Sequence, residues 1–167
     1  MKIFDSHCHL DDKAYRKDLV RVIERARQAG IARIMTIGVN KKTAARAVEI
    51  AQSYPGIYAA VGYHPHDAGQ CNAGELDFLT ELAQNQRVRA WGEIGLDYNR
   101  MYSPREDQEK WFVRQLQIAA QLKLPLIFHE RDTRGRFLEI LKTEFKNDCG
   151  GVVHCFSGTL PKLKQYI

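Results

Sequence analysis

The chain has 167 residues, of which 44% are hydrophobic and 27% are charged. This length and composition suit a single globular domain with its own core. No apolar run reaches the roughly 18–20 residues of a membrane span, and the N-terminal segment turns polar too early for a secretory signal, so we expect a cytoplasmic protein with no membrane partner. The net charge of +5 suits a polyanionic partner, although the basic residues are spread as on an ordinary solvated surface.

The predicted elements alternate between short apolar strands and amphipathic helices. In chain order, the pattern predicts strands at 2–5, 31–38, 57–62, 88–95, 124–129 and 151–154, with helices at 14–29, 41–53, 74–84, 103–123, 133–146 and from about 159. For the helix at 103–123, we expect Ser103 to be the N-cap and Glu106 its capping-box partner. Alternating apolar strands and helices indicate an α/β fold with a parallel sheet. Either a doubly wound sheet or a TIM-barrel (β/α) type fits six strands.

Chemically reactive side chains gather where the predicted strands end. All six histidines lie there, and Glu93 ends the fourth strand. In a barrel, the C-terminal ends of the strands form a ring on one face. An open sheet spreads them along a line. Because distant residues converge more easily on a ring, this distribution favours the barrel.

The residue types at these strand ends are those of a divalent-metal site. Imidazole and carboxylate together suit zinc or manganese, and magnesium where oxygen ligands dominate. His7 and His9 have strand spacing, so their rings face the same side. A carboxylate such as Glu93 can bridge two ions, and a two-metal site serves phosphodiester hydrolysis. We therefore predict two divalent ions (Mg, Mn or Zn) at a site that draws on His7, His9, Glu93, His129 and His154.

Four further residues near these strand ends have open roles. His64 is expected to contact a substrate phosphate or a metal-bound water, whereas His66 is expected to be a surface loop residue. Asp97 either orients a ligand or caps the following loop. Arg131 either pairs with a phosphate or with a neighbouring carboxylate. The sequence contains neither a glycine-rich phosphate loop nor a Gly-x-Ser-x-Gly motif, which argues against a P-loop enzyme and a serine hydrolase.

The chain resembles the TatD family of metal-dependent deoxyribonucleases, which belongs to the amidohydrolase-like TIM-barrel group. The matching segments are DSHCHLD (5–11), GYHPHD (62–67), GEIGLDY (92–98), LPLIFHERD (124–132) and GVVHCFSG (151–158). The resemblance implies metal-dependent hydrolysis of DNA phosphodiester bonds, as in a 3′-5′ exonuclease, with single-stranded DNA as the partner. It also implies that His7, His9, Glu93, His129 and His154 bind metal and that Glu93 and His64 are catalytic.

The resemblance departs from the family pattern at the C-terminal end. A TIM barrel has eight strands, so we expect one domain over residues 1–167, C-terminally incomplete, with about six of the eight βα units. The family's Thr-Asp-x-Pro motif, whose aspartate is implied as a further metal ligand and general base, has no counterpart here. We therefore expect weakened metal binding, little nuclease activity and self-association through open sheet edges.

Two other functions remain open from the sequence. One is a related barrel hydrolase that acts on an amide, lactone or phosphotriester. Such enzymes often carry a carboxylated lysine after the fourth strand, where this chain has Glu93. The other is a non-catalytic protein that binds metal but has lost the missing aspartate.

Overall fold

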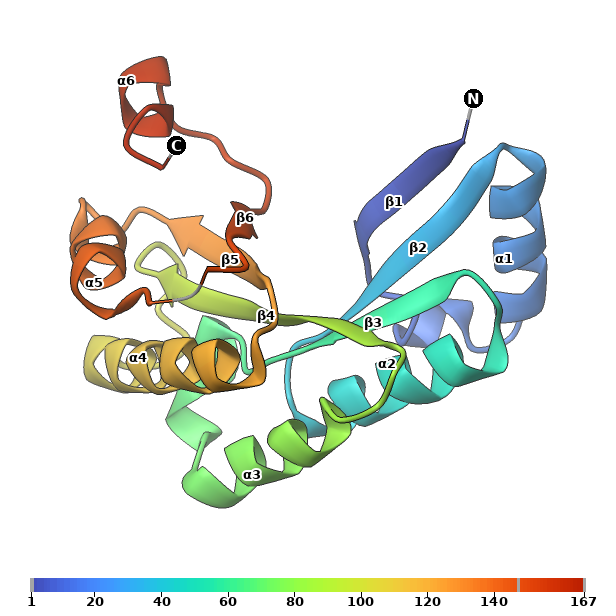
Figure 1. Ribbon diagram of the computed structural model, residues 1–167, viewed down its shortest axis with the longest axis horizontal. Coiled ribbons are helices and arrows are strands. Elements are labelled where there is room, and N and C mark those ends of the chain that lie inside the picture. Colours follow the sequence, from blue (N-terminus) through green and yellow to red (C-terminus); the bar gives the residue numbers. More distant parts are fainter. Residues whose placement is uncertain (1, 147, 167) are drawn as a thin grey trace.

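The computed structural model describes residues 2–146 and 148–166, in which six strands form one parallel sheet (Figure 1). The strands are β1 (Ile3–Cys8), β2 (Ile31–Gly38), β3 (Ile57–Val61), β4 (Val88–Asp97), β5 (Leu126–Arg131) and β6 (Gly151–Val153). Their order in the sheet follows the chain from β1 to β6, and each neighbouring pair is parallel.

The strand order decides between the two predicted architectures. A doubly wound sheet reverses its strand order partway across, whereas a barrel adds each strand beside the preceding one. This sheet never reverses, and it curls into a half-barrel (Figure 1). The prediction of a TIM-barrel type α/β fold with about six βα units is confirmed.

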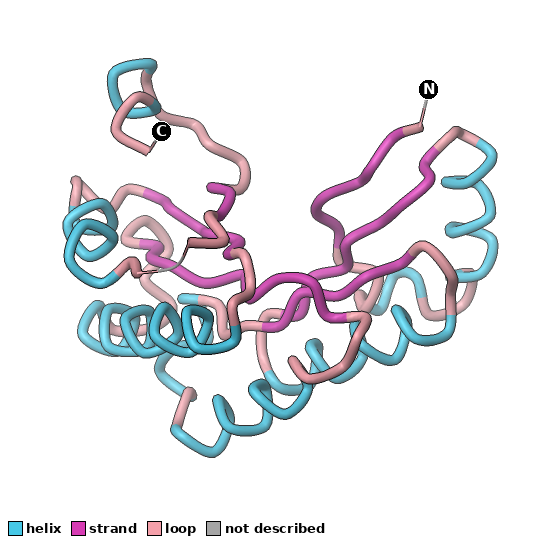
Figure 2. The backbone as a smooth tube through the Cα atoms, viewed as in Figure 1, coloured by secondary structure: helices cyan, strands magenta, loops and turns pink. Residues whose placement is uncertain are grey.

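Helices follow the strands in the predicted alternation. They are α1 (Leu19–Gln28), α2 (Lys41–Ser53), α3 (Ala73–Leu82), α4 (Arg105–Leu122), α5 (Arg136–Glu144) and the short α6 (Leu160–Leu163). The first five cover the convex side of the curled sheet, so that strands form the inner layer and helices the outer one (Figure 2). Within the described ranges, no helix combines the length and apolarity that crossing a lipid bilayer requires.

The main core lies between the sheet and these helices. Trp91 of β4 packs there with Phe112 of α4 and Phe137 of α5, and each of the three is at most 1% exposed. A smaller apolar cluster is formed by Met35, Ile37, Ala60, Ala90 and Ile127, which come from the strands alone. Apolar residues on successive positions of these strands are thus divided between two clusters, as expected for strands buried on both faces.

Both outer strands of the sheet have an open edge in the described part of the chain, where β1 pairs only with β2 and β6 only with β5. Each carries a half-exposed apolar side chain, Phe4 on β1 at 50% and Val152 on β6 at 55%. Open edges of this kind invite pairing with other strands. Self-association through these edges stays a prediction.

Several local predictions were wrong. The first helix begins at Leu19 rather than residue 14, because a short 3-10 turn at Lys13–Tyr15 precedes it. Ser103 does not cap α4, whose N-cap is Pro104 without a side-chain hydrogen bond. Instead the Ser103 hydroxyl accepts a hydrogen bond from the Gly69 N–H at 2.9 Å and donates one to the His66 carbonyl at 2.8 Å. A contact with residues 65–70, which follow β3, therefore replaces the expected cap.

Candidate metal centre

All of the predicted site residues lie around one cavity at the C-terminal ends of the strands. His7 belongs to β1, His9 follows it, and His154 directly follows β6. Glu93 and His129 lie inside β4 and β5 rather than at their ends, because both strands extend further than predicted. The cavity has a volume of about 590 Å³, and it is lined among others by His7, His9, His64, Glu93, His129 and His154.

Glu93 is the buried carboxylate at the centre of this group. It is 3% exposed. Its Oε1 lies 3.0 Å from His129 Nδ1 and 3.8 Å from His64 Nε2, and its Oε2 lies 3.3 Å from His7 Nε2. Burial alone would raise the pKa of Glu93, but the hydrogen bond from His129, the adjacent His7 side chain and the charge of His64 hold it well below its usual range. Glu93 is thus an anion surrounded by imidazoles.

His7 carries a ring nitrogen that lacks a hydrogen bond. Its Nε2 is buried and has no hydrogen-bond partner among the described residues. The ring stacks on that of His154 with centroids 3.5 Å apart and an angle of 10° between the planes. Burial, and then the charge of His7, lower the pKa of His154, so its ring favours the neutral form. Two stacked imidazoles beside a carboxylate suit a cation that accepts nitrogen lone pairs.

The tautomers of two other histidines follow from their hydrogen bonds. His9 Nδ1 lies 3.1 Å from the Ile37 carbonyl, which only accepts, so Nδ1 carries the hydrogen and Nε2 is left as a potential ligand. His64 Nδ1 accepts from the His66 N–H at 3.1 Å. Burial lowers the pKa of His64 to about 3. Neutral His64 therefore carries its hydrogen on Nε2, where it can donate to an anionic substrate.

The donor atoms form two groups that fit a divalent cation. His7, Glu93 and His154 form one, and His64, His66 and His129 form the other; within each group the ligand atoms lie within 4.8 Å of one another. The unsatisfied His7 Nε2 beside the Glu93 carboxylate favours the first group as a cation site. Nitrogen and carboxylate donors of this kind suit zinc or manganese. The residues present therefore fit the predicted metal.

His66 is not the surface loop residue that the sequence suggested. It lies in a 3-10 helix (Pro65–Gln70) that was not predicted, and its side chain is 23% exposed. Its Nε2 lies 2.6 Å from Asp97 Oδ2. The prediction failed because β4 continues to Asp97 and brings this carboxylate under the loop that follows β3.

Asp97 fulfils both roles that the sequence left open. Its Oδ2 also lies 3.1 Å from His129 Nε2, while its Oδ1 accepts from the N–H groups of Asn99 and Arg100 at 3.0 and 2.9 Å. Burial opposes ionisation, but the Arg100 backbone and the His66 and His129 side chains hold the pKa of Asp97 at about 2. Asp97 therefore orients two imidazoles and fixes the turn after β4.

His129 is held between two carboxylates. Its Nδ1 faces Glu93 and its Nε2 faces Asp97. Burial lowers the pKa of His129, but these carboxylates outweigh burial, so that the pKa lies above its usual value. The raised pKa favours the imidazolium form of His129, whose positive charge faces the two carboxylates. A divalent ion beside Glu93 would compete with that proton, which couples metal binding to proton release.

Sequence reasoning missed two buried glutamines of α4. Gln115 Oε1 accepts from the Tyr63 N–H at 2.7 Å and from Trp91 Nε1 at 3.3 Å, and its Nε2 donates to the Tyr63 carbonyl at 3.0 Å. It therefore fixes the backbone next to His64. Gln108 does the same for Asp97. The available signal was the spacing, because positions 108, 112, 115 and 119 share one buried helix face.

Comparison with known proteins places the chain in a family. The model of the family described as TatD related DNase matches residues 4–167. The chain is 40% identical over 157 residues to an uncharacterized metal-dependent hydrolase, YabD, of Bacillus subtilis, covering 94% of this chain and 62% of that protein. It is 36% identical to the 3′-5′ ssDNA/RNA exonuclease TatD of Escherichia coli, covering 99% of this chain and 64% of that protein.

A solved structure supports the same assignment. The crystal structure of YJJV, a TatD homolog from Escherichia coli, has a TM-score of 0.86 and 31% sequence identity, covering 98% of this chain and 64% of that one. The chain thus spans less than two thirds of the length of these relatives. The family model matches nearly all of the sequence, and both the sequence identity to the relatives and the similarity of fold agree with it. This chain therefore belongs to the TatD related DNase family.

Proposed function

We propose that this chain provides the metal-binding half-barrel of an enzyme that hydrolyses phosphodiester bonds in single-stranded nucleic acid. The observation that carries the proposal is the buried Glu93 carboxylate, which is surrounded by three imidazoles and lies beside the unsatisfied His7 Nε2. A relative that covers the whole chain is named for exonuclease action on ssDNA and RNA. Membership of the family and the donor set thus support the same chemistry.

The residues divide into those that hold metal and those that serve the substrate. His7, His9, Glu93, His129 and His154 would hold one or two divalent ions. When bound, such ions supply Lewis-acid polarisation of the phosphodiester and activation of water near neutral pH. His64 would donate a hydrogen bond from Nε2 to a phosphate oxygen, because its Nδ1 is occupied by the His66 N–H. Asp97 would keep His129 and His66 in position.

Calorimetric titration of the purified chain with Mn²⁺ tests the metal site. We expect saturable binding that falls at least about 10-fold in Glu93→Gln, because the central anionic ligand is lost. The matched control is Glu24→Gln, an exposed glutamate on α1, which should bind Mn²⁺ as the native chain does. Equal Mn²⁺ binding by the native chain and Glu93→Gln would remove the basis of the proposal.

Hydrolysis is tested separately with a fluorescent single-stranded oligonucleotide in Mn²⁺ or Mg²⁺. We expect slow shortening that EDTA stops and that His129→Ala and Glu93→Gln abolish. Metal binding without cleavage would instead favour the non-catalytic metal-binding alternative. Cleavage of amide or ester substrates but not of DNA would favour a related barrel hydrolase. The number and identity of the ions, the oligomeric state and the cytoplasmic location stay predictions.

A further inference from the structure

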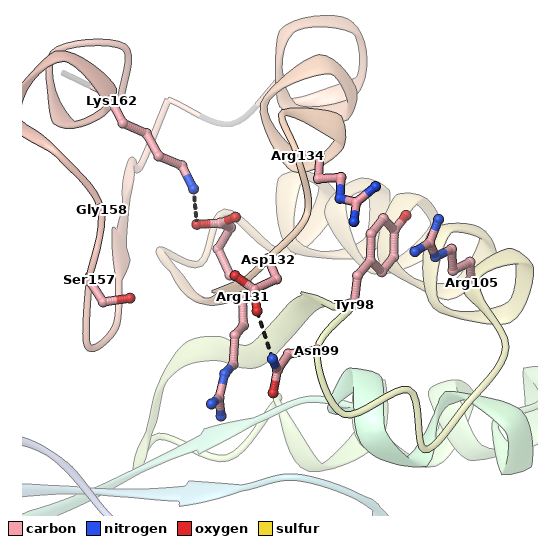
Figure 3. Close-up of a pocket in the computed structure, with 10 residues that line it drawn as sticks. Tyr98, Asn99, Arg105, Arg131, Asp132, Arg134, Ser157, Gly158 and Lys162 are labelled. Atoms are coloured by element: carbon pink, nitrogen blue, oxygen red, sulfur yellow. Dashed lines mark hydrogen bonds and ion pairs between the residues drawn. The ribbon is translucent and has the colours of Figure 1, made fainter.

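A second cavity lies beside the metal centre and is strongly basic. It has a volume of about 760 Å³. Its walls are the loops that follow β4, β5 and β6, together with side chains from α4 and α6 (Figure 3). We call it the basic pocket, and it is lined by Tyr98, Asn99, Arg105, Glu130, Arg131, Asp132, Arg134, Ser157, Gly158 and Lys162.

The basic pocket adjoins the metal centre. Glu130, Arg131 and Ser157 line both cavities. Arg131 is the last residue of β5, two positions after His129, so a chain that leaves the metal centre along β5 passes Arg131. A ligand longer than one nucleotide at the metal centre would therefore lie next to the basic pocket.

The basic pocket carries more positive than negative charge. Four cationic side chains face two carboxylates. Lys162 Nζ pairs with Glu130 Oε2 at 2.7 Å, and Asp132 Oδ2 accepts from the Asn99 amide at 2.7 Å. Among the described residues, no carboxylate lies within 4.0 Å of the guanidinium groups of Arg105, Arg131 or Arg134, whereas Arg136 nearby has two such partners.

Arg105 is held in place by an aromatic ring rather than by an acidic partner. The Arg105 guanidinium lies over the Tyr98 ring, 4.4 Å from its centroid, and the Tyr98 hydroxyl donates to Glu109 at 2.6 Å. Arg134 lines the same pocket as Tyr98 (Figure 3). The position of the Arg105 guanidinium therefore depends on the placement of Tyr98.

The loop that presents Arg134 has an unusual backbone. Asp132, Arg134 and Gly135 all have positive φ, at 54°, 52° and 93°. Between them Thr133 is 1% exposed, and its hydroxyl donates to Glu130 Oε1 at 2.6 Å. Non-glycine residues in this region cost free energy and cluster at binding sites. The buried and hydrogen-bonded Thr133 therefore fixes the backbone next to Arg134.

We propose that the basic pocket binds the phosphate next to the scissile one in a single-stranded nucleic acid, with Arg134 and Arg105 as its principal contacts. Guanidinium groups suit phosphate because they donate in a planar fork. A cavity of roughly 300–1,000 Å³ has the size that suits a small ligand such as one nucleotide. The inference rests on the proposed function, since it takes the metal centre as the place of the scissile phosphate.

The test is binding of a fluorescein-labelled oligothymidylate, measured by fluorescence anisotropy in EDTA so that no strand is cleaved. Arg134→Ala and Arg105→Ala should each raise the Kd by about 5- to 10-fold. Each should also lower the slope of log K against log salt by about 0.7 between about 50 and 200 mM NaCl, because one phosphate contact is lost. Arg21→Ala is the matched control, an exposed arginine on α1 at the far end of the sheet.

The outcomes separate this inference from the proposed function. If Arg134→Ala and Arg105→Ala bind like the native chain, or no more weakly than Arg21→Ala, the inference is wrong even where Mn²⁺-dependent cleavage is observed. If both variants lose binding and the native chain never cleaves, the basic pocket stands and the proposed hydrolysis fails. The charge reversal Arg134→Glu should weaken binding further than Arg134→Ala. Unchanged thermal unfolding of the variants shows that the fold is kept.

Discussion

The side-chain amide of Gln108 forms hydrogen bonds with both the N–H and the carbonyl group of Asp97. Its Oε1 accepts from the Asp97 N–H at 2.9 Å, and its Nε2 donates to the Asp97 carbonyl at 3.1 Å and to the Ser103 carbonyl at 2.8 Å. Gln108 is 1% exposed. A side chain of α4 thereby sets the position of the carboxylate that holds His66 and His129, so the metal centre depends on the packing of this helix against β4.

Replacing Gln108 with methionine keeps its volume but removes these hydrogen bonds. We expect the free energy of unfolding to fall by about 2–4 kcal/mol, because buried backbone groups at Asp97 and Ser103 lose their partners. Urea unfolding measures the change. Gln117→Met, an exposed position on the same helix, should alter stability by less than about 0.5 kcal/mol. A similar loss of unfolding free energy in both variants would show that the Gln108 hydrogen bonds do not stabilise the fold.

Asp97→Asn should weaken Mn²⁺ binding by about 10- to 100-fold, since the residue that orients the His129 ring loses its charge. The asparagine keeps an oxygen that can accept from the Asn99 and Arg100 N–H groups, so the turn should persist. NMR titration of the metal-free chain should show a lower pKa for His129 than in the native chain, because one of its two carboxylate partners is gone. Asp77→Asn, on the exposed side of α3, is the control, and an unchanged His129 pKa in Asp97→Asn would contradict the positioning role.

Gly62 lies where β3 approaches β4 most closely. A Cβ at this position would lie 2.7 Å from the Gly92 carbonyl carbon and 2.8 Å from its Cα. Gly62→Ala should therefore push the strands apart next to Glu93 and destabilise the protein by about 1–3 kcal/mol. At Gly69 a Cβ would have its nearest neighbour at 3.5 Å, so Gly69→Ala should be nearly neutral in the same thermal or urea unfolding experiment. Equal stability of the two variants would be inconsistent with this close approach.

Glu109 gives the stability of the protein a pH dependence away from the metal centre. The Arg136 guanidinium donates to its Oε2 at 2.9 and 2.7 Å, which lowers the pKa of Glu109 below its usual value. A lowered folded-state pKa stabilises the fold above the unfolded-state pKa of about 4.3, and this contribution is lost as the pH falls through the folded value.

Glu109→Gln should therefore reduce stability by less than about 1 kcal/mol near neutral pH, because both partners are partly solvent-exposed and screened. The difference between native chain and variant should vanish in strong acid. Urea midpoints measured across a pH series provide the check. A destabilisation that persists unchanged below the folded-state pKa would have to come from the Tyr98 hydroxyl contact instead of the ion pair.

The sequence alone determined the repeating pattern of the fold and predicted the residues of the candidate metal centre. Apolar runs and helix periodicity predicted six strands and the helices between them, since side-chain period is a local property. The pair His7 and His9, together with the expected strand-end placement of Glu93, His129 and His154, was enough to predict that these residues share one cavity. Parallel strands bring their C-terminal ends to one edge whatever the loops between them do.

Only the tertiary structure decided how these groups contact one another. The strand order excluded the doubly wound alternative, because pairing is set by connections that no local window reveals. The extension of β4 to Asp97 turned His66 from an expected surface residue into a partner of that carboxylate. In the sequence, Gln108 is one more polar residue of the predicted helix. Its role depends on the backbone of Asp97, which lies across the interface between β4 and α4. Such contacts join segments that are far apart in the sequence, so the spacing of residues along the chain does not predict them.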